Sequence, residues 1–473
     1  MGKESRAKYL AKNTFIFALG NFGTKIINFF LVPIYTYVLN SAQYGTVDLI
    51  TTITTVLAPV LILNISESVM RYSLDKDSDQ SAISRTGILC LLFGIIIGLL
   101  VIPISKSFST ISAYSGHLYL YMISLACSQF FLSELRGKEK LLAYSVGNII
   151  NTLAIACLNI LFLIGMKLGI TGYLIAYIVA NFITAVYALI VSRTIRDLKH
   201  FHIDRELSKE MIKYGVVLVP NTFMWWIMNS SDRVMVTSMI SVSANGIYAI
   251  SYKIPTLLST ASSIFNQAWG YSAIREDDSA DKVEFNNKAF HALTAIVLTA
   301  GTIMMLLIRP FLSLYVSESY YTAWKYTPYL IIGCSFLTLG TFLATQYTVH
   351  KDSKGYLFSA TVGAILNIVL NYFLIPVMGV SGAALATCIS YITVYIYRII
   401  DTRKYIKLDI FNKGIVTGSI VLVLSGISIF IEEPIGYTLL IIEVFIILFV
   451  FKDTWSTFLR LILRKLKKQE VKS

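Results

Sequence analysis

Charged residues are scarce in this sequence. Only 14% of its 473 residues are Asp, Glu, Lys or Arg, whereas a soluble globular protein carries about 25%. Hydrophobic residues make up 56% of the chain, and no polar stretch is long enough to fold as a separate soluble domain. These shortages exclude an ordinary soluble protein. They indicate a polytopic membrane protein whose function resides among its helices.

Residues suited to enzyme chemistry are also few. The five cysteines lie in apolar segments without metal-binding or redox spacing, so we interpret them as packing residues. The five histidines are scattered, and there is no Ser/His/Asp set, paired-carboxylate motif or nucleotide-binding loop. We therefore expect a protein that is not an enzyme and that has no catalytic residues, no metal site and no cofactor.

Apolar segments long enough to cross a bilayer as helices recur along the whole chain. A hydrocarbon core of about 30 Å requires about 20 residues of helix. Hydropathy and the charged or Gly/Pro-rich breaks predict an all-α fold of about fourteen transmembrane helices. The predicted ranges are 14–39, 46–68, 84–105, 115–134, 142–166, 169–191, 212–239, 247–270, 289–315, 324–347, 357–377, 380–400, 412–431 and 435–451.

The basic residues indicate how these helices are oriented. Of the 40 lysines and arginines, 33 lie in or beside the termini and alternate connections, while the other connections hold only Lys106, Lys167 and Lys325. Because basic residues concentrate on the cytoplasmic side, we predict that both termini are cytoplasmic. This topology also explains the net charge of +13, so no nucleic-acid partner is expected.

Two pairs of short segments indicate an internal repeat. Both pairs match at an offset of about 200 residues, which corresponds to six predicted helices. Parallel repeats of this kind are a transporter architecture. We therefore predict six-helix lobes over 1–200 and 201–408, two further helices over 409–452 and a basic cytoplasmic tail over 453–473. The matching positions are Gly169, Gly172 and Ala176 with Gly379, Gly382 and Ala386, and Gly45 with Gly246.

Two segments resemble a known family. They are "KNTFIFALGNFGTKIINFFLVPIYTYVLNSAQYGTVDL" and "NSSDRVMVTSMISVSANGIYAISYKI". The chain resembles the polysaccharide and O-antigen flippases of the multidrug/oligosaccharidyl-lipid/polysaccharide exporter superfamily. The residues that carry the resemblance are Gly20, Lys25, Pro33, Tyr44, Gly45, Asp232, Arg233, Gly246, Tyr248 and Lys253.

This resemblance implies a MATE-like, V-shaped fold of two lobes in the bacterial plasma membrane. It also implies alternating access that moves a lipid-linked oligosaccharide from the inner to the outer leaflet. The carrier lipid would be a polyprenyl pyrophosphate, typically undecaprenyl pyrophosphate, and the product would be O-antigen, capsule or exopolysaccharide. Membrane lipids, a polysaccharide polymerase and chain-length machinery are the further partners that we consider.

Lys25 is a candidate substrate-binding residue. It lies eleven residues into the first predicted helix, or about 16 Å along it, which is near the membrane midplane. A cation at this depth is costly unless it faces water or a partner. The alternative is a structural lysine that pairs with a carboxylate or with helix carbonyls.

Asp232, Arg233 and Lys253 form a second candidate site. The first two precede a predicted turn near residue 243 by ten or eleven residues, and Lys253 follows it by ten. All three are therefore expected at one level of the membrane. We predict that Arg233 faces the substrate cavity with Lys253, and that Asp232 is a structural or coupling charge. The alternative is a structural pair of Asp232 with Lys253 that fixes the hairpin.

Arg71 is a candidate for the first capture of pyrophosphate at the cytoplasmic mouth. Glu67 precedes it by four residues, a spacing at which helical side chains meet. A plain positive-inside anchor is the alternative for Arg71. Asp48 lies near the start of the second predicted helix, where a carboxylate is favoured, so we interpret it as a helix cap.

Aromatic residues could stack on sugar rings. Tyr35, Tyr252 and Trp269 lie on the predicted helices that carry the charges. Packing and anchoring at the membrane interface are the alternative explanation.

Three alternative functions are left open. A lipid II-type peptidoglycan precursor flippase also has fourteen helices and belongs to a related family. A cation-coupled small-molecule exporter of the same superfamily would be expected to bury carboxylates, whereas the buried charges here are mainly Lys and Arg. An integral membrane polymerase is the least favoured, because the predicted connections are too short to hold a catalytic domain.

Overall fold

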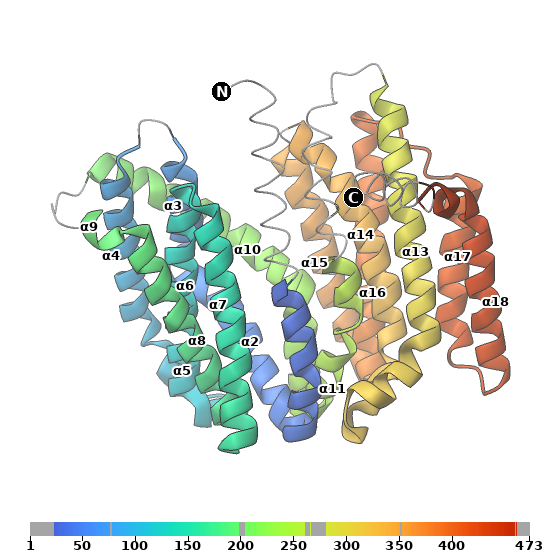
Figure 1. The fold of residues 1–473 in the computed structure, drawn as a ribbon, viewed down its shortest axis with the longest axis horizontal. Coiled ribbons are helices and arrows are strands. Elements are labelled where there is room, and N and C mark those ends of the chain that lie inside the picture. The colour runs from blue at the N-terminus through green and yellow to red at the C-terminus, as the bar shows by residue number, and fades with distance from the viewer. Residues whose placement is uncertain are drawn as a thin grey trace, which may run out of the picture. The chain divides into compact units, whose positions relative to one another are not determined.

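A computed structural model describes residues 23–75, 78–197, 204–260, 265, 281–350, 352–458 and 460. Over these residues the chain is helical and contains no strand (Figure 1). Nine helical segments among them are long and apolar enough to cross a membrane, or ten if one pair bent by 69° is a single span. The all-α, multi-pass fold class is confirmed, and the total of fourteen spanning helices stays a prediction.

The chain forms two compact units. The first runs to Ala249 and also contains Val316–Tyr320, and the second contains Ile250–Tyr315 and resumes at Tyr321. The units therefore divide after residue 249, whereas the first predicted lobe ends at residue 200. The helix that follows residue 204 packs on the first unit, which accounts for this difference. The division into two six-helix lobes stays a prediction.

The first unit begins with a helix over residues 23–38. Its further helices are α2 (Ser41–Leu61), α3 (Ile65–Ser73), α4 (Gln80–Gly98), α5 (Val101–Lys106), η1 (Ser112–Tyr114), α6 (Ser115–Gly137), α7 (Leu141–Asn159), the π-helix η2 (Ile160–Gly165), α8 (Gly169–Ser192), α9 (Thr194–Asp197), α10 (Arg205–Met239) and α11 (Val242–Ser251), which continues two residues into the second unit.

The core of the first unit lies around α6, which packs against α2, α3, α4 and α8. Phe130 of α6 is completely buried, with Ile62, Val69 and Met211 in the same apolar cluster. These side chains come from segments up to about 150 residues apart in the sequence. Burial of each such side chain contributes about 1.5–3 kcal/mol relative to exposure in water.

The predicted helix 46–68 is wrong in its bounds, because the chain turns within it. Pro59 lies inside the last turns of α2, and Leu63 and Asn64 both have positive φ angles, 54° and 50°. Few non-glycine residues adopt this conformation. Gly215 of α10 lies against this turn, and a Cβ there would be 2.2 Å from the Leu63 carbonyl oxygen. The close approach of α10 therefore requires glycine.

The second unit comprises a helix over residues 255–260 and further helices that follow residue 281. Among its spans, α14 is the most deeply buried and packs against α13, α15, α16 and α17. The further helices are α13 (Lys282–Tyr315), η3 (Glu318–Lys325, of which the first three residues belong to the first unit), α14 (Thr327–Val349), α15 (Ser353–Met378), α16 (Val380–Asp401), η4 (Thr402–Lys404), α17 (Lys413–Ser428) and α18 (Ile435–Val450).

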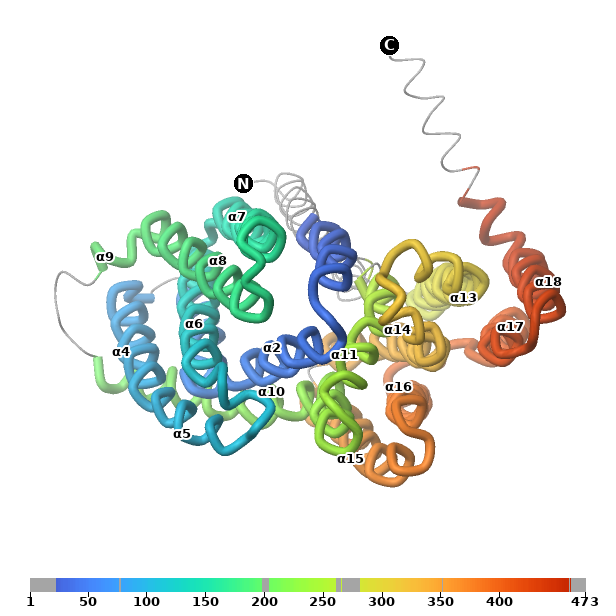
Figure 2. The backbone as a smooth tube through the Cα atoms, turned by 90° about the horizontal axis from the view of Figure 1, so that it is seen from below, coloured from blue at the N-terminus to red at the C-terminus, as the bar shows by residue number. Residues whose placement is uncertain are grey.

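The two further helices predicted over 409–452 correspond to α17 and α18, which lie side by side (Figure 2). Both pack against α13. Arg309 of α13 donates a hydrogen bond to the Ile429 carbonyl at 2.5 Å, and its guanidinium lies 3.9 Å from the ring centre of Trp324. Glu433 pairs with the same guanidinium at 3.3 Å. Arg309 therefore ties the α17–α18 connection to α13.

The predicted repeat has a backbone counterpart in each unit. Gly169 precedes the main part of α8 with φ of +57°, and Gly379 precedes α16 with φ of +60°. Both are left-handed conformations in which glycine is favoured. Gly172 and Gly382 follow three residues later. A Cβ on Gly382 would clash with the Leu374 carbonyl of α15, and a Cβ on Gly172 would lie 2.9 Å from the Leu168 Cβ and 3.1 Å from the Phe162 Cβ of η2. The matched sequence thus forms the same tight connection twice.

Candidate functional site

Helices α2 and α11, which carry the matched glycines Gly45 and Gly246, cross at these two residues. A Cβ on Gly45 of α2 would lie 1.9 Å from the carbonyl oxygen of Val242. A Cβ on Gly246 of α11 would lie 2.0 Å from the carbonyl oxygen of Ser41. The hydroxyls of Ser41 and Ser243 are 2.5 Å apart and share a hydrogen bond. Only glycine at both positions lets the two backbones approach this closely.

An ion pair lies next to this crossing. The Arg233 guanidinium of α10 donates from Nη1 to Oδ1 of Asp48 on α2 at 2.8 Å. Asn245 of α11 donates from Nδ2 to Oδ2 of Asp48 at 3.3 Å and to the Gly45 carbonyl at 3.2 Å. The Asp48 and Arg233 side chains are only 9% and 19% exposed. Asp48 thus joins three helices of the first unit.

The position of Asp48 corrects one expectation. Helix α2 begins at Ser41, and Asn40 caps it by accepting a hydrogen bond from the Gln43 backbone at 2.9 Å. Asp48 therefore lies seven residues inside α2, and the interpretation of Asp48 as a helix cap is wrong. Its carboxylate instead pairs with Arg233. A buried ion pair holds both charges in place, because the loss of one partner costs about 3–5 kcal/mol.

Asp232 has its own partners in the first unit. Its Oδ2 accepts a hydrogen bond from the Tyr248 hydroxyl at 2.6 Å, and its Oδ1 accepts one from the Arg233 backbone at 2.9 Å. The Asp232 side chain is buried. Lys253 is half-buried and belongs to the second unit, so its predicted pairing with Asp232 stays a prediction.

The tyrosines expected to stack on sugars are buried. The Tyr35 ring packs edge-on against Tyr173 at a centroid distance of 5.0 Å and lies 6.3 Å from Tyr44. Tyr35 in the first unit and Tyr252 in the second are no more than 5% exposed. Sugar stacking by these rings stays a prediction. Trp269 lies outside the described residues.

Lys25 and Arg71 are exposed residues of the first unit. Lys25 is exposed on the helix over 23–38. Arg71 pairs with Asp75 at 2.7 Å, with the two side chains 54% and 57% exposed. The hydrogen bond to Asp75 raises the pKa of Arg71. The expectation that Arg71 meets Glu67 is wrong, because its acid partner among the described residues lies four residues later, not four earlier.

The Asp48 network contains an ion pair and amide hydrogen bonds. Over the residues that the structure describes, no three His, Cys, Asp or Glu side chains gather as a metal site would require. A guanidinium beside a carboxylate can, however, exchange that partner for another oxyanion.

Sequence analysis missed Asp48 and Asn245 as parts of this site. Asn245 directly precedes Gly246, and Asp48 follows Gly45 by three residues. The matched glycines were the available signal, because a crossing at these two positions brings their neighbours together. Hydropathy alone cannot predict the contact between Asp48 and Arg233, which lie 185 positions apart in the sequence.

Comparison with known proteins establishes the family. Residues 10–270 match the family model described as "Polysaccharide biosynthesis protein". This chain belongs to that family. The match covers more than half of the chain and includes every residue of the Asp48 network. This family assignment agrees with the resemblance to polysaccharide flippases, which was identified from one N-terminal segment and one central segment.

Individual proteins that resemble this chain do so over a short segment or at low sequence identity. The probable lipid II flippase MurJ of Thermotoga maritima is 32% identical over 98 residues, which is 20% of this chain and 21% of the relative. The match thus spans about a fifth of each protein. A lipid II flippase MurJ structure in an inward closed conformation has a TM-score of 0.66 at 15% identity, over 95% of this chain and 100% of that chain.

A second structural relative is an inward-facing MATE family multidrug resistance transporter of the MOP superfamily. Its TM-score is also 0.66, at 14% identity over 82% of this chain and 97% of that chain. Identities this low show a shared fold and do not show a shared substrate. They confirm the expected MATE-like fold.

Proposed function

We propose that this protein moves a polyprenyl-pyrophosphate-linked oligosaccharide from the inner to the outer leaflet of the bacterial plasma membrane. The observation that carries this proposal is the family match to polysaccharide biosynthesis over residues 10–270. The flippase-like fold over 95% of the chain supports it. The oligosaccharide would be a repeat unit of O-antigen, capsule or exopolysaccharide, and movement would proceed by alternating access.

Arg233 supplies the chemistry for handling the pyrophosphate. Guanidinium groups bind carboxylates and phosphates through the same paired donors. In this structure Asp48 occupies the guanidinium at 2.8 Å. Pyrophosphate carries more charge than one carboxylate and would replace Asp48 as the partner of Arg233. Lys25, Lys253 and Arg71 remain candidate substrate-binding residues in this proposal, and Asp232 remains a structural or coupling charge.

The location follows from the distribution of charge. The bias of 33 basic residues to three supports cytoplasmic termini. A flippase of this orientation would receive its substrate from cytoplasmic glycosyltransferases. A polysaccharide polymerase and chain-length machinery would use the product on the outer side of the membrane.

A lipid II-type precursor is the second candidate substrate. The 98 residues that match a probable lipid II flippase at 32% identity favour it. Both substrates are polyprenyl pyrophosphates, so the chemistry proposed for Arg233 applies to either. The sugar, and not the lipid or the phosphate, distinguishes them.

The proposal is tested in cells from which the protein is removed. Surface polysaccharide should disappear, and its lipid-linked precursor should accumulate on the cytoplasmic face. Lys25→Ala and Arg233→Ala should fail to restore export even when their expression is raised until each matches the abundance of the unmodified protein. Loss of cell-wall precursor export with normal surface polysaccharide would favour the lipid II alternative. Normal export of both would contradict the proposed function.

A further inference from the structure

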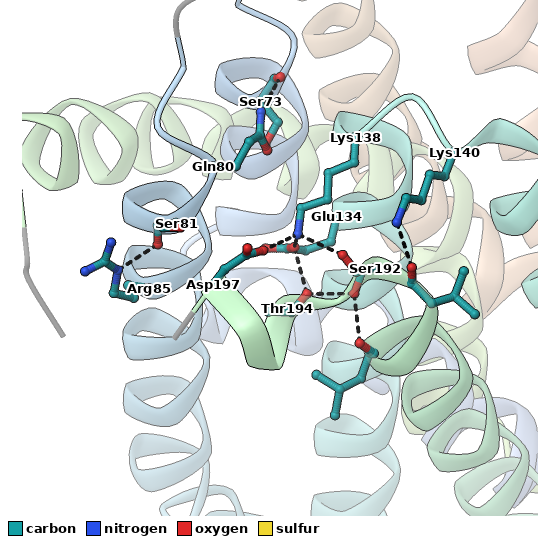
Figure 3. Close-up of polar contacts among 12 residues, drawn as sticks. Ser73, Gln80, Ser81, Arg85, Glu134, Lys138, Lys140, Ser192, Thr194 and Asp197 are labelled. Carbon is teal, nitrogen blue, oxygen red and sulfur yellow. Dashed lines mark hydrogen bonds and ion pairs between the residues drawn. The ribbon is translucent and has the colours of Figure 1, made fainter. Parts of the chain in front are cut away.

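Lys138 and Lys140 lie close to the end of α8 in the first unit (Figure 3), and among the described residues the ion pairs at this position are those of Lys138. The Lys138 ammonium lies 2.7 Å from both Glu134 and Asp197. Although burial disfavours its charge, attraction to these carboxylates raises the pKa of Lys138. Thr194 donates a further hydrogen bond to Glu134 at 2.9 Å. Both acids are therefore committed to Lys138.

Lys140 lies beside this group, and the described residues provide no acid within ion-pair distance of it. Its ammonium donates to the Val191 carbonyl at 2.8 Å (Figure 3). An ammonium has three donors, so this contact leaves two. Burial, and then repulsion from Arg193 and Lys138, lower the pKa of Lys140. The fold thus holds Lys140 close to a second cation that no described carboxylate neutralises.

That second cation is Arg193, which occupies an unusual position. It ends α8 with φ of +61°, a left-handed conformation that favours glycine. An arginine here is strained by about 1 kcal/mol relative to glycine. Its side chain is exposed, and it forms no ion pair with a described acid. A positively charged side chain therefore stands at a position where the backbone conformation favours glycine.

Exposed apolar side chains are close in sequence to these two cations, in the first turn of α7 and the last turn of α8. Leu142 follows Lys140 by two residues and is 63% exposed, and Ile190 precedes Arg193 by three and is 64% exposed. In a membrane-spanning helix, exposed apolar side chains of this kind face lipid. Adjacent basic and lipid-facing residues at a helix end match the headgroup and acyl chain of one lipid.

We propose that Lys140 and Arg193 form a binding site for the phosphate of an anionic phospholipid, with the acyl chains along Leu142 and Ile190. The phosphodiester accepts hydrogen bonds from the remaining Lys140 donors and from the Arg193 guanidinium. The bound anion also relieves the repulsion between the two cations. The lipid would hold the α6–α7 turn against the end of α8, from which the chain continues towards α10.

Lipid retention tests the site. The protein is purified from mixed membranes of phosphatidylcholine and phosphatidylglycerol, and the bound lipids are measured by native mass spectrometry. Phosphatidylglycerol should be retained preferentially, and Lys140→Gln or Arg193→Gln should weaken this retention about tenfold, as expected for the loss of one charge-assisted hydrogen bond. Lys106→Gln, which removes an exposed lysine of α5, is the matched control and should retain the lipid.

Two further variants separate the charge from the backbone. Arg193→Gly should lose phosphatidylglycerol retention while unfolding at the same or a higher temperature in phosphatidylcholine, because glycine relaxes the left-handed position. Arg193→Lys should keep most of the retention. Equal retention in the unmodified protein and in both charge-removing variants would overturn the proposal. Displacement of the lipid by inorganic phosphate at equal concentration would overturn it as well, since the acyl chains would then contribute nothing.

Discussion

Gly45 and Gly246 occupy matching positions in two repeated segments, and their backbones lie against each other in the first unit. Ser41 and Ser243, which match at nearly the same offset, share a hydrogen bond at the same crossing. Contact between equivalent residues is expected where two copies of a motif cross about a local two-fold axis. The crossing fixes α2 against α11 and so brings Asp48 within reach of Asn245 and Arg233.

Adding a methyl group at this crossing should destabilise the protein. Gly246→Ala places a Cβ about 2.0 Å from the Ser41 carbonyl oxygen. This oxygen belongs to the backbone of α2, so it cannot move away without shifting the helix. Overpacking of this kind costs about 1–3 kcal/mol. The midpoint of thermal unfolding in detergent should fall accordingly. Gly116→Ala is the matched control, because no atom lies within 4 Å of its Cβ; an equal midpoint for both variants would contradict the crossing.

Removing either partner of the Asp48–Arg233 pair should cost more than removing both. Asp48→Asn and Arg233→Gln each remove one member of a largely buried ion pair, at a cost of about 3–5 kcal/mol. The double variant removes both charges and should be more stable than the sum of the single effects implies. Denaturant unfolding of the four proteins measures this coupling. Additive effects would show that the two side chains do not stabilise each other.

The Arg71–Asp75 pair should contribute little to stability. Both side chains are more than half exposed, and water screens an exposed ion pair so that it contributes little to stability. Arg71→Gln should therefore leave the unfolding midpoint almost unchanged, yet reduce transport if Arg71 captures pyrophosphate. Asp75→Asn is the control, since it retains the arginine and should not reduce transport. Equal transport by all three proteins would remove Arg71 from the substrate path.

Acid should destabilise the end of α15 through Asp352. Hydrogen bonds from the Gly355 backbone, from Tyr405 and from Lys404 lower the pKa of this carboxyl to about 2, against about 3.9 in an unfolded chain. A lowered pKa stabilises the folded state above the unfolded value, and this contribution is lost as the pH falls from about 4 towards 2. Asp352→Asn should show less of this acid dependence in unfolding measurements, whereas an unchanged dependence would contradict the assignment.

Continuous apolar segments made much of the fold predictable. The predicted helix 169–191 corresponds to α8, 380–400 to α16 and 435–451 to α18, each within about two residues. Hydropathy locates such helices because the membrane requires a long apolar segment with internally satisfied backbone. The turn between α2 and α3 was missed because Leu63 and Asn64 are not glycine, and their positive φ angles depend on packing against α10.

The candidate site was less predictable, because its partners are set by tertiary contacts. The cost of burying charge singled out Asp232 and Arg233 correctly as residues that need partners. Asp48 was misassigned because its distance from the helix start was judged from hydropathy, which placed that start at residue 46. Helix α2 begins at Ser41. Five additional residues turn Asp48 from a cap into an interior residue on the face that meets Arg233.

The central claim is that this protein moves a lipid-linked oligosaccharide between leaflets, and one measurement tests it most directly. The purified protein is reconstituted into vesicles that contain a fluorescent polyprenyl-pyrophosphate oligosaccharide, and an impermeant quencher is added outside. We predict that the protein exposes the inner-leaflet lipid to the quencher, and that Arg233→Gln does so far more slowly. Quenching no greater than in empty vesicles, together with transport of cationic dyes by the same preparation, would contradict the account.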